Sequence, residues 1–221
     1  EMEGCDWSSD VCSSDLELAP LAECEQHTKY HKYDVFEHTL HAVDAIDFND
    51  RILRLTMFFH DFGKPDAKTT DENGTSHFKG HAVISEKKTR DILKRLKFDN
   101  NTTNEVSKLV LIHDMKSPRD KIQAKKMMCS LGDEAYLNLI KIKRADNMAK
   151  ADPHAIDEKL KNMRSFYEEI KASNECYNLK SLAVNGDDIK AFGIAEGKEI
   201  KSSLDFLLNG VIEGKCQNRK D

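Results

Sequence analysis

The sequence predicts an all-α fold, a helical bundle followed by a small helical tail. The chain has 221 residues, of which 33% are charged and 39% hydrophobic, and it contains only ten glycines and four prolines, a composition that leans toward helix. Apolar residues also recur at spacings of three and four in successive segments, which is the helical period. A chain of this length can bury a real core as one large domain, or as one domain and a tail.

Charge and cysteine usage exclude several classes of protein. A net charge of −5 argues against a chain that binds polyanions over its whole surface, because phosphate affinity comes largely from clustered lysine and arginine. Basic stretches at 87–97, 116–126 and 141–150 could still bind phosphate locally, but charge runs of this kind are more typical of solvated helix faces. The six cysteines include no C-x-x-C pair and are interpreted as reduced thiols. No run approaches the ~20 apolar residues of a membrane span. We therefore expect a cytoplasmic chain without a membrane partner.

Residues 1–16 differ from the rest of the chain. The triplet Ser-Ser-Asp at 8–10 recurs at 13–15 without apolar periodicity, and residues 11–16 resemble a translated sequencing adapter. We expect residues 1–16 to be a non-native leader and derive the fold from residue 17 onward. A disordered native leader is the alternative.

The first predicted helix, over residues 34–47, separates its two histidines onto different faces. Val35, His38 and Ala42 follow one another at spacings of three and four, so His38 lies on a small apolar stripe that faces another helix. His41 falls on the acidic face and is predicted to be a surface residue.

The second predicted helix begins at Asn49 or Asp50, either of which can cap it, and it is apolar nearly all round and therefore central. Gly63 is predicted to close this helix as a left-handed C-cap, and the nearby proline stops it. His60 and Asp61 therefore lie on its last turn. Adjacent residues differ there by about 100° around the axis, yet both can reach one ion.

The third predicted helix carries His77 and His81, four residues apart, after a polar loop over residues 66–76. His81 is the candidate ligand, and His77 is a secondary candidate for contact with the substrate or with a ligand. The buried stripe of this helix is expected at Ala82, Ser85, Thr89, Ile92 and Leu96.

The fourth predicted helix opens with Thr102-x-x-Glu105, the signature of a capping box. Its apolar face starts at Val106 and ends at the i+7 position with His113, so His113 is predicted to face inward.

The fifth predicted helix, over residues 133–150, places Asp146 on its apolar side. A carboxylate in that position is unfavourable unless it has a partner. Residues 154–172 predict a further charged helix. Beyond residue 182 we expect two short helices, divided by glycine-containing turns at 185–186 and 196–197.

These helices aim several histidine and aspartate side chains at the middle of the bundle. A hydrogen-bonded core residue explains each one alone, but not a contribution from five helices together. The candidate metal ligands are His38, His60, Asp61, His81, His113 and Asp146. Imidazole and carboxylate without thiolate suit Mn, Fe, Co, Ni or Zn, or Mg where water fills much of the shell. The predicted first metal site consists of His38, His60, Asp61 and Asp146. His81 and His113 are predicted to hold a second ion, with Asp61 bridging.

A divalent metal in this position indicates hydrolysis. It lowers the pKa of bound water from about 15.7 towards ~7 and withdraws charge from a phosphoryl group. Asp61 and Lys64 are the candidate catalytic residues, with Lys64 neutralising a substrate phosphate or the departing oxygen. An ordinary cation at a helix C-terminus is the alternative for Lys64. No cofactor other than the metal is predicted.

The motifs around these residues resemble the HD superfamily of metal-dependent phosphohydrolases, whose signature is a histidine, a His-Asp pair and a distant aspartate. Here His38 lies in Tyr-Asp-Val-Phe-Glu-His-Thr-Leu, His60 and Asp61 lie in Phe-His-Asp-Phe-Gly-Lys-Pro, and Asp146 lies in Arg-Ala-Asp. The resemblance implies an HD-type helical bundle with phosphohydrolase activity.

From about residue 18 onward the chain is similar to the HD-containing C-terminal half of bacterial CCA-adding tRNA nucleotidyltransferases. The likeness includes His-Phe-Lys-Gly-His at 77–81, Leu-Ile-His-Asp at 111–114 and the segment 182–189. It implies an HD domain over residues 17–175 and a tail of the tRNA-binding-body type over residues 176–221. It also implies phosphatase, 2'-nucleotidase and 2',3'-cyclic phosphodiesterase activities.

The chain contains no glycine-rich nucleotidyltransferase motif with paired aspartates, so we expect a fragment that lacks the polymerising head. The predicted function is hydrolysis of nucleotide or RNA-terminal phosphoesters, with tRNA as a further partner. The alternatives are a non-catalytic tRNA-binding body with a structural metal, and a nucleotide sensor that binds without cleaving. The sequence leaves the oligomeric state open.

Overall fold

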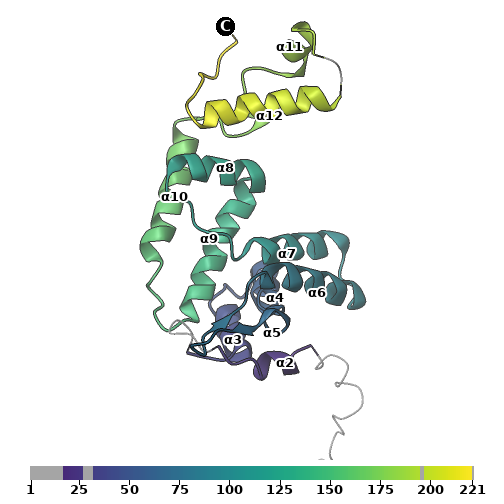
Figure 1. The fold of residues 1–221 in the computed structure, drawn as a ribbon, viewed down its shortest axis with the longest axis vertical. Helices are drawn as coiled ribbons and strands as arrows, with labels where there is room; N and C mark the ends of the chain where they lie inside the picture. Colours follow the sequence, from purple (N-terminus) through teal and green to yellow (C-terminus); the bar gives the residue numbers. More distant parts are fainter. Residues whose placement is uncertain (1–16, 27–31, 195–196, 221) are drawn as a thin grey trace, which may run out of the picture. The chain divides into compact units, whose positions relative to one another are not determined.

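The computed structural model describes residues 17–26, 32–194 and 197–220, and Figure 1 draws the remaining residues in grey. The described part is mostly helical, with a small two-stranded sheet, so the predicted all-α fold is confirmed. No helix in these described ranges combines the length and the apolar character that crossing a membrane requires. The predicted leader, residues 1–16, lies outside the described residues.

The chain divides into two compact units. The first comprises the chain up to Met115 together with Lys141–Asp157, and the second comprises Lys116–Ile140 together with Glu158–Asp221. Helix α9 (Asp133–Met148) therefore contributes to both units, with its C-terminal half in the first. The predicted division into a domain over residues 17–175 and a helical tail over residues 176–221 stays a prediction.

The first unit is a set of helices around a common apolar core. In chain order its helices before the shared α9 are α2 (Ala19–Ala22), α3 (Val35–Asp44), α4 (Arg51–Phe59), α5 (Lys64–Ala67), α6 (His81–Arg95) and α7 (Asn100–Ile112). Helix α4 packs against both α3 and α7, and α7 packs along α6, which makes α4 central as predicted. The buried core includes Leu21, Val35, Phe59, Phe62, Leu93 and Val110.

The junction between α4 and α5 differs from the predicted helix end. Gly63 is right-handed, with φ −87° and ψ −6°, so it is not the left-handed C-cap that the sequence indicated. The glycine is needed there for space, because a Cβ would lie 2.4 Å from the carbonyl oxygen of His81. Its N–H donates to Ser85 Oγ at 2.8 Å. Pro65 sits in the first turn of the short helix α5, where a missing N–H is tolerated, instead of ending a helix.

Replacing Ser85 by Ala is expected to destabilise the chain by about 1–3 kcal/mol, because the buried N–H of Gly63 would lose its acceptor. Ser107 on α7 provides a matched control, since its hydroxyl is equally buried but has no hydrogen-bond partner among the described residues. Ser107→Ala should leave stability unchanged or raise it. Urea denaturation of both variants measures the difference, and equal midpoints would contradict the role given to Ser85.

Helix α6 begins later than the sequence indicated. Its first residue is His81, and Gly80 precedes it with φ +82°, a left-handed conformation that favours glycine. His77 is therefore not on this helix but in strand β2 (Ser76–His77), which pairs antiparallel with β1 (Thr69–Thr70). The predicted buried stripe is confirmed at its middle, but Leu96 at its end is 54% exposed.

The start of α7 also differs from the prediction. Asp99 is the N-cap, since its carboxylate accepts from the Thr102 N–H at 2.9 Å and from the Thr102 hydroxyl at 2.7 Å. The predicted capping box headed by Thr102 is wrong, because Thr102 already lies inside the helix. The Asp99 carboxylate instead satisfies the orphan N–H of Thr102, the third residue of the helix.

The second unit contains one helix, α8, that was not predicted from the sequence. In chain order its helices are α8 (Lys121–Leu131), the N-terminal half of α9, α10 (Asp157–Ala172), η1 (Leu179–Ser181), α11 (Gly186–Ala191) and α12 (Lys198–Ile212). Helix α8 buries only Ala124 and Met128, so its sequence shows basic residues more clearly than an apolar stripe. The two predicted tail helices correspond to α11 and α12, although α12 is longer than expected. Gly186 begins α11 and is not part of a turn, and residue 196 of the second predicted turn lies outside the described residues.

Candidate metal centre

All the predicted ligands come together in the first unit. His38 lies on α3, His60 ends α4, Asp61 follows it in the turn to α5, and Asp146 lies near the end of α9. His81 begins α6, and His113 ends α7. The four histidines and Asp61 are all buried, whereas the side chain of Asp146 keeps 23% of its surface exposed. Six side chains from different elements therefore share one polar interior.

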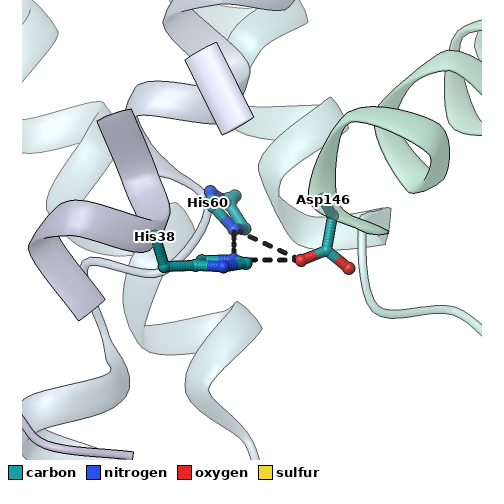
Figure 2. A group of neighbouring side chains, drawn as sticks. All are labelled: His38, His60 and Asp146. Carbon is teal, nitrogen blue, oxygen red and sulfur yellow. Dashed lines mark hydrogen bonds and ion pairs between the residues drawn. The ribbon is translucent and has the colours of Figure 1, made fainter. Parts of the chain in front are cut away.

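Three of these residues form one group, which Figure 2 shows. His38 Nε2 lies 3.1 Å from Asp146 Oδ1, and His60 Nε2 lies 3.9 Å from the same oxygen. The two Nε2 atoms of His38 and His60 are 3.4 Å apart. The three ligand atoms thus surround a small volume that could hold one metal ion.

The other three residues form a second group that could also hold an ion. His81 Nε2 lies 3.0 Å from His113 Nε2. Asp61 Oδ1 lies 3.4 Å from His81 Nε2 and 3.9 Å from His113 Nε2. The second oxygen of Asp61 faces the first group, 3.1 Å from His60 Nε2 and 3.5 Å from His38 Nε2. Asp61 therefore stands between the two groups and contacts both.

Backbone carbonyls orient each of the four imidazole rings. The Nδ1 atom of His38 lies 3.2 Å from the carbonyl oxygen of Ala149, and that of His60 lies 2.6 Å from the carbonyl oxygen of Met57. The Nδ1 atom of His81 lies 2.8 Å from the carbonyl oxygen of Phe78, and that of His113 lies 2.6 Å from the carbonyl oxygen of Val110. A carbonyl only accepts, so each Nδ1 carries a proton, and in the neutral form of each ring Nε2 presents a lone pair to the centre. Lone pairs that face each other at 3.0 and 3.4 Å need a positive charge between them. A proton on one ring or a metal ion would supply that charge.

The surroundings keep the carboxyl groups of the centre ionised. Burial would raise the pKa of Asp61, but the neighbouring His60 and Lys64 outweigh burial and hold that pKa well below its usual range. Burial is likewise outweighed in Asp146, chiefly by Lys150 and by His38, so the pKa of Asp146 is also well below its usual range. Both of these candidate ligands are therefore anionic at neutral pH.

His113 is neutral at neutral pH. Burial and the nearby His60 together lower the pKa of His113 to about 3. A neutral imidazole whose Nδ1–H is engaged by a carbonyl is the form in which histidine binds metals. The environment of His113 thus suits a metal ligand better than a charged surface histidine.

A lysine pairs with each of the two aspartates. Lys64 Nζ lies 2.7 Å from Asp61 Oδ2 and donates to Gln26 Oε1 at 2.7 Å. Lys150 Nζ lies 2.6 Å from Asp146 Oδ2 and leaves Oδ1 of that carboxylate to the two histidines. Lys64 is the first residue of α5 and is only 6% exposed. This burial and its partner distinguish Lys64 from the ordinary helix-end cation that the sequence allowed.

The centre opens into a cavity of about 320 Å³. The residues that line it are Asp61, Lys64, Phe78, Lys79, His81, His113, Asp114, Asp146 and Lys150. The predicted site residues did not include Phe78, Lys79, Asp114 or Lys150. Three of them could have been found from their position next to candidate ligands in the sequence, because Phe78 and Lys79 lie inside the motif at 77–81 and Asp114 follows His113. His77, in contrast, is exposed and pairs with Asp71 through Nε2 at 2.9 Å, away from this cavity.

Comparison with protein families gives one finding for this chain. Residues 69–221 match the family model described as tRNA nucleotidyltransferase domain 2. The matched range includes His81, His113 and Asp146, and it begins after the other three candidate ligands. A search of curated proteins finds no match.

Proposed function

Because this chain belongs to the tRNA nucleotidyltransferase domain 2 family, we propose that it acts on nucleotides or RNA termini, as a metal-dependent phosphohydrolase of the HD type. The single observation that carries this proposal is the arrangement of two His-carboxylate groups, both in contact with Asp61, that open into a lysine-lined cavity. Phosphatase and 2',3'-cyclic phosphodiesterase reactions are the proposed activities. The reduced thiols of the described cysteines fit the proposed cytoplasmic location.

The donor set suits a divalent first-row metal. Each group offers two imidazole nitrogens and one carboxylate oxygen within 4.8 Å of one another, and there is no thiolate among them. His38, His60 and Asp146 would hold one ion, and Asp61, His81 and His113 would hold the other. A divalent ion there supplies a Lewis acid for a phosphoryl group and lowers the pKa of water at the site. Mn, Fe, Co, Ni, Zn and Mg remain the proposed candidates.

The protein's own residues prepare the site for an anionic substrate. Lys64 and Lys150 each bind one oxygen of a ligand carboxylate, which fixes the orientation of Asp61 and Asp146. Both ammonium groups also line the cavity, so they lower the energy of a phosphate that enters it. We propose Asp61 and Lys64 as the residues on which hydrolysis depends most directly.

Removal of the metal tests the proposal. Dialysis against a chelator is expected to abolish hydrolysis of p-nitrophenyl phosphate and of 2',3'-cyclic adenosine monophosphate, and addition of one divalent metal should restore both. Metal analysis should find bound metal in the active preparation only. His77→Ala is a suitable control, because His77 lies outside the centre, and this variant should keep its metal and its turnover. Turnover that survives removal of the metal would overturn the proposal.

A non-catalytic tRNA-binding body is the second candidate. The family match favours it in one respect, since the match includes all of α8 to α12 but not His38, His60 or Asp61. In that case tRNA would bind in a salt-dependent manner after metal removal, and no phosphoester would be hydrolysed at any metal concentration. A nucleotide sensor would instead bind nucleotide tightly without releasing product.

A further inference from the structure

The charges that line the cavity are unequally compensated. Lys64 is paired with Asp61, and Lys150 is paired with Asp146, so these four residues form two ion pairs. The remaining charged residues of the lining are Lys79 and Asp114. Neither of them forms a hydrogen bond or an ion pair with a described residue. Asp114 attracts the nearby Lys150 electrostatically without an ion-pair contact. The cavity therefore presents one cation and one carboxylate that are not hydrogen-bonded to described residues, beside the candidate metal centre.

Lys79 is held close to the centre by the turn that precedes α6. The carbonyl of its neighbour Phe78 accepts from His81 Nδ1 at 2.8 Å, and Gly80 follows Lys79 in a left-handed conformation. The turn is therefore tied directly to a candidate ligand. The Lys79 side chain itself is exposed, so its ammonium can meet an anion without breaking an internal contact.

Asp114 is also held close to the centre, by the turn that follows α7. It directly follows His113, whose Nδ1 lies 2.6 Å from the carbonyl oxygen of Val110, and its own side chain is exposed. A carboxylate is an acceptor only and repels phosphate, so its natural partner in a substrate is a hydroxyl group. The lining thus offers complementary contacts to a molecule that carries both a phosphate and a free hydroxyl.

We propose that Lys79 and Asp114 are specificity-determining residues, with Lys79 binding a phosphate oxygen of the substrate and Asp114 accepting a hydrogen bond from a sugar hydroxyl near that phosphate. This inference rests on the phosphohydrolase function proposed above. It deepens that function, because among phosphomonoesters the pair would favour a ribose phosphoester with a free neighbouring hydroxyl over a deoxyribose phosphoester. Lys79 supplies binding strength, and Asp114 supplies discrimination.

Kinetics of the metal-loaded full chain test both roles. Lys79→Met is expected to raise KM about 10-fold for p-nitrophenyl phosphate and for adenosine 3'-monophosphate, because it removes a charged contact of the bound phosphate. Its kcat and its metal content should not change. Asp114→Asn is expected to reduce the preference for adenosine 3'-monophosphate over its 2'-deoxy counterpart about 5-fold, because a neutral amide oxygen accepts a weaker hydrogen bond from the sugar hydroxyl than a carboxylate does. Its KM for p-nitrophenyl phosphate, which has no sugar, should not rise.

Lys87→Met and Asp91→Asn are the matched controls, since both residues are exposed on α6 and neither lines the cavity. If Lys79→Met behaves like Lys87→Met, the role of Lys79 is overturned. An unchanged ribose preference in Asp114→Asn, or a parent without such a preference, overturns the role of Asp114.

Binding of inorganic phosphate separates this inference from the proposed hydrolysis. Calorimetric titration should show about 10-fold weaker phosphate binding in Lys79→Met and no weakening in Asp114→Asn. A metal-loaded chain that binds phosphate in this Lys79-dependent manner but never turns over would remove the hydrolase proposal and keep the phosphate contact. Normal turnover with phosphate binding unchanged in Lys79→Met would keep the hydrolase proposal and remove the phosphate contact of Lys79.

Discussion

Replacing Asp61 by Asn is expected to remove bound metal and hydrolytic turnover together. One oxygen of Asp61 faces His81 and His113, and the other faces His38 and His60, so a single substitution weakens both candidate metal groups. Loss of a residue that only hydrogen-bonds to a metal ligand typically reduces metal affinity or activity 10–100-fold. Loss of Asp61, a candidate ligand that contacts both groups, should therefore reduce turnover by about 100-fold or more. Metal analysis and the p-nitrophenyl phosphate assay measure the two effects on the same preparations.

The same substitution also leaves Lys64 buried without its carboxylate partner. Breaking a buried ion pair from one side costs about 3–5 kcal/mol, and Lys64 is only 6% exposed. The double variant Asp61→Asn with Lys64→Met removes the unpaired charge and should regain much of this stability while it stays inactive and free of metal. Recovery of fold without recovery of metal separates the role of Asp61 as a ligand from its role in stability. Asp91→Asn, at an exposed position on α6, is the control and should match the parent in stability, bound metal and turnover. Metal and turnover at parental levels in Asp61→Asn would remove Asp61 from the mechanism.

Replacing Gly63 by Ala is expected to destabilise the chain by about 3 kcal/mol, the upper range for overpacking. The new Cβ would lie 2.4 Å from the carbonyl oxygen of His81 and 2.7 Å from the backbone nitrogen of Ser85. Both are backbone atoms of α6, so the strain cannot be relieved by rotation of a side chain. The start of α6 would have to move away from α5, and His81 would move with it. Urea denaturation should show the loss of stability, and the variant should bind metal more weakly than the parent.

Gly186→Ala is the control for this effect. A Cβ at Gly186 would meet Ile200 Cγ2 at 3.5 Å, an ordinary van der Waals contact, and the position does not require a left-handed backbone. This variant should unfold at the parental urea concentration. If Gly63→Ala is as stable as Gly186→Ala, the close approach of α5 to α6 does not constrain the centre as described.

The helices were predictable where their apolar faces are regular. Val35, His38 and Ala42 lie buried on α3 as their spacing predicts, and Leu139 and Ile142 lie buried on α9. The charged helix α10 also appears where the sequence placed it. Helix α8 was missed because few of its residues are buried, so local periodicity carries little signal there.

The ends of helices were less predictable than their faces. The sequence assigned Gly63 to a left-handed cap because glycine commonly serves that purpose. The structure shows instead that the glycine makes room for the backbone of α6, a segment about twenty residues further along the chain. His77 was placed on α6 because it shares a helical spacing with His81, but the left-handed Gly80 starts the helix after it. Space beside a distant segment therefore decided the conformation of Gly63, and the left-handed turn at Gly80 decided the position of His77.

By itself the sequence determined the helical class and the types of side chain that face the interior, because both follow from the local period of apolar residues. The tertiary structure decided how those side chains combine. It placed Asp61 between two groups, paired Lys64 and Lys150 with the aspartates, and brought Lys79 and Asp114 to the same cavity. Periodicity specifies the direction of a side chain around its own helix axis. It contains no information on which ring nitrogen and which carboxylate oxygen meet, since that depends on how separate helices pack.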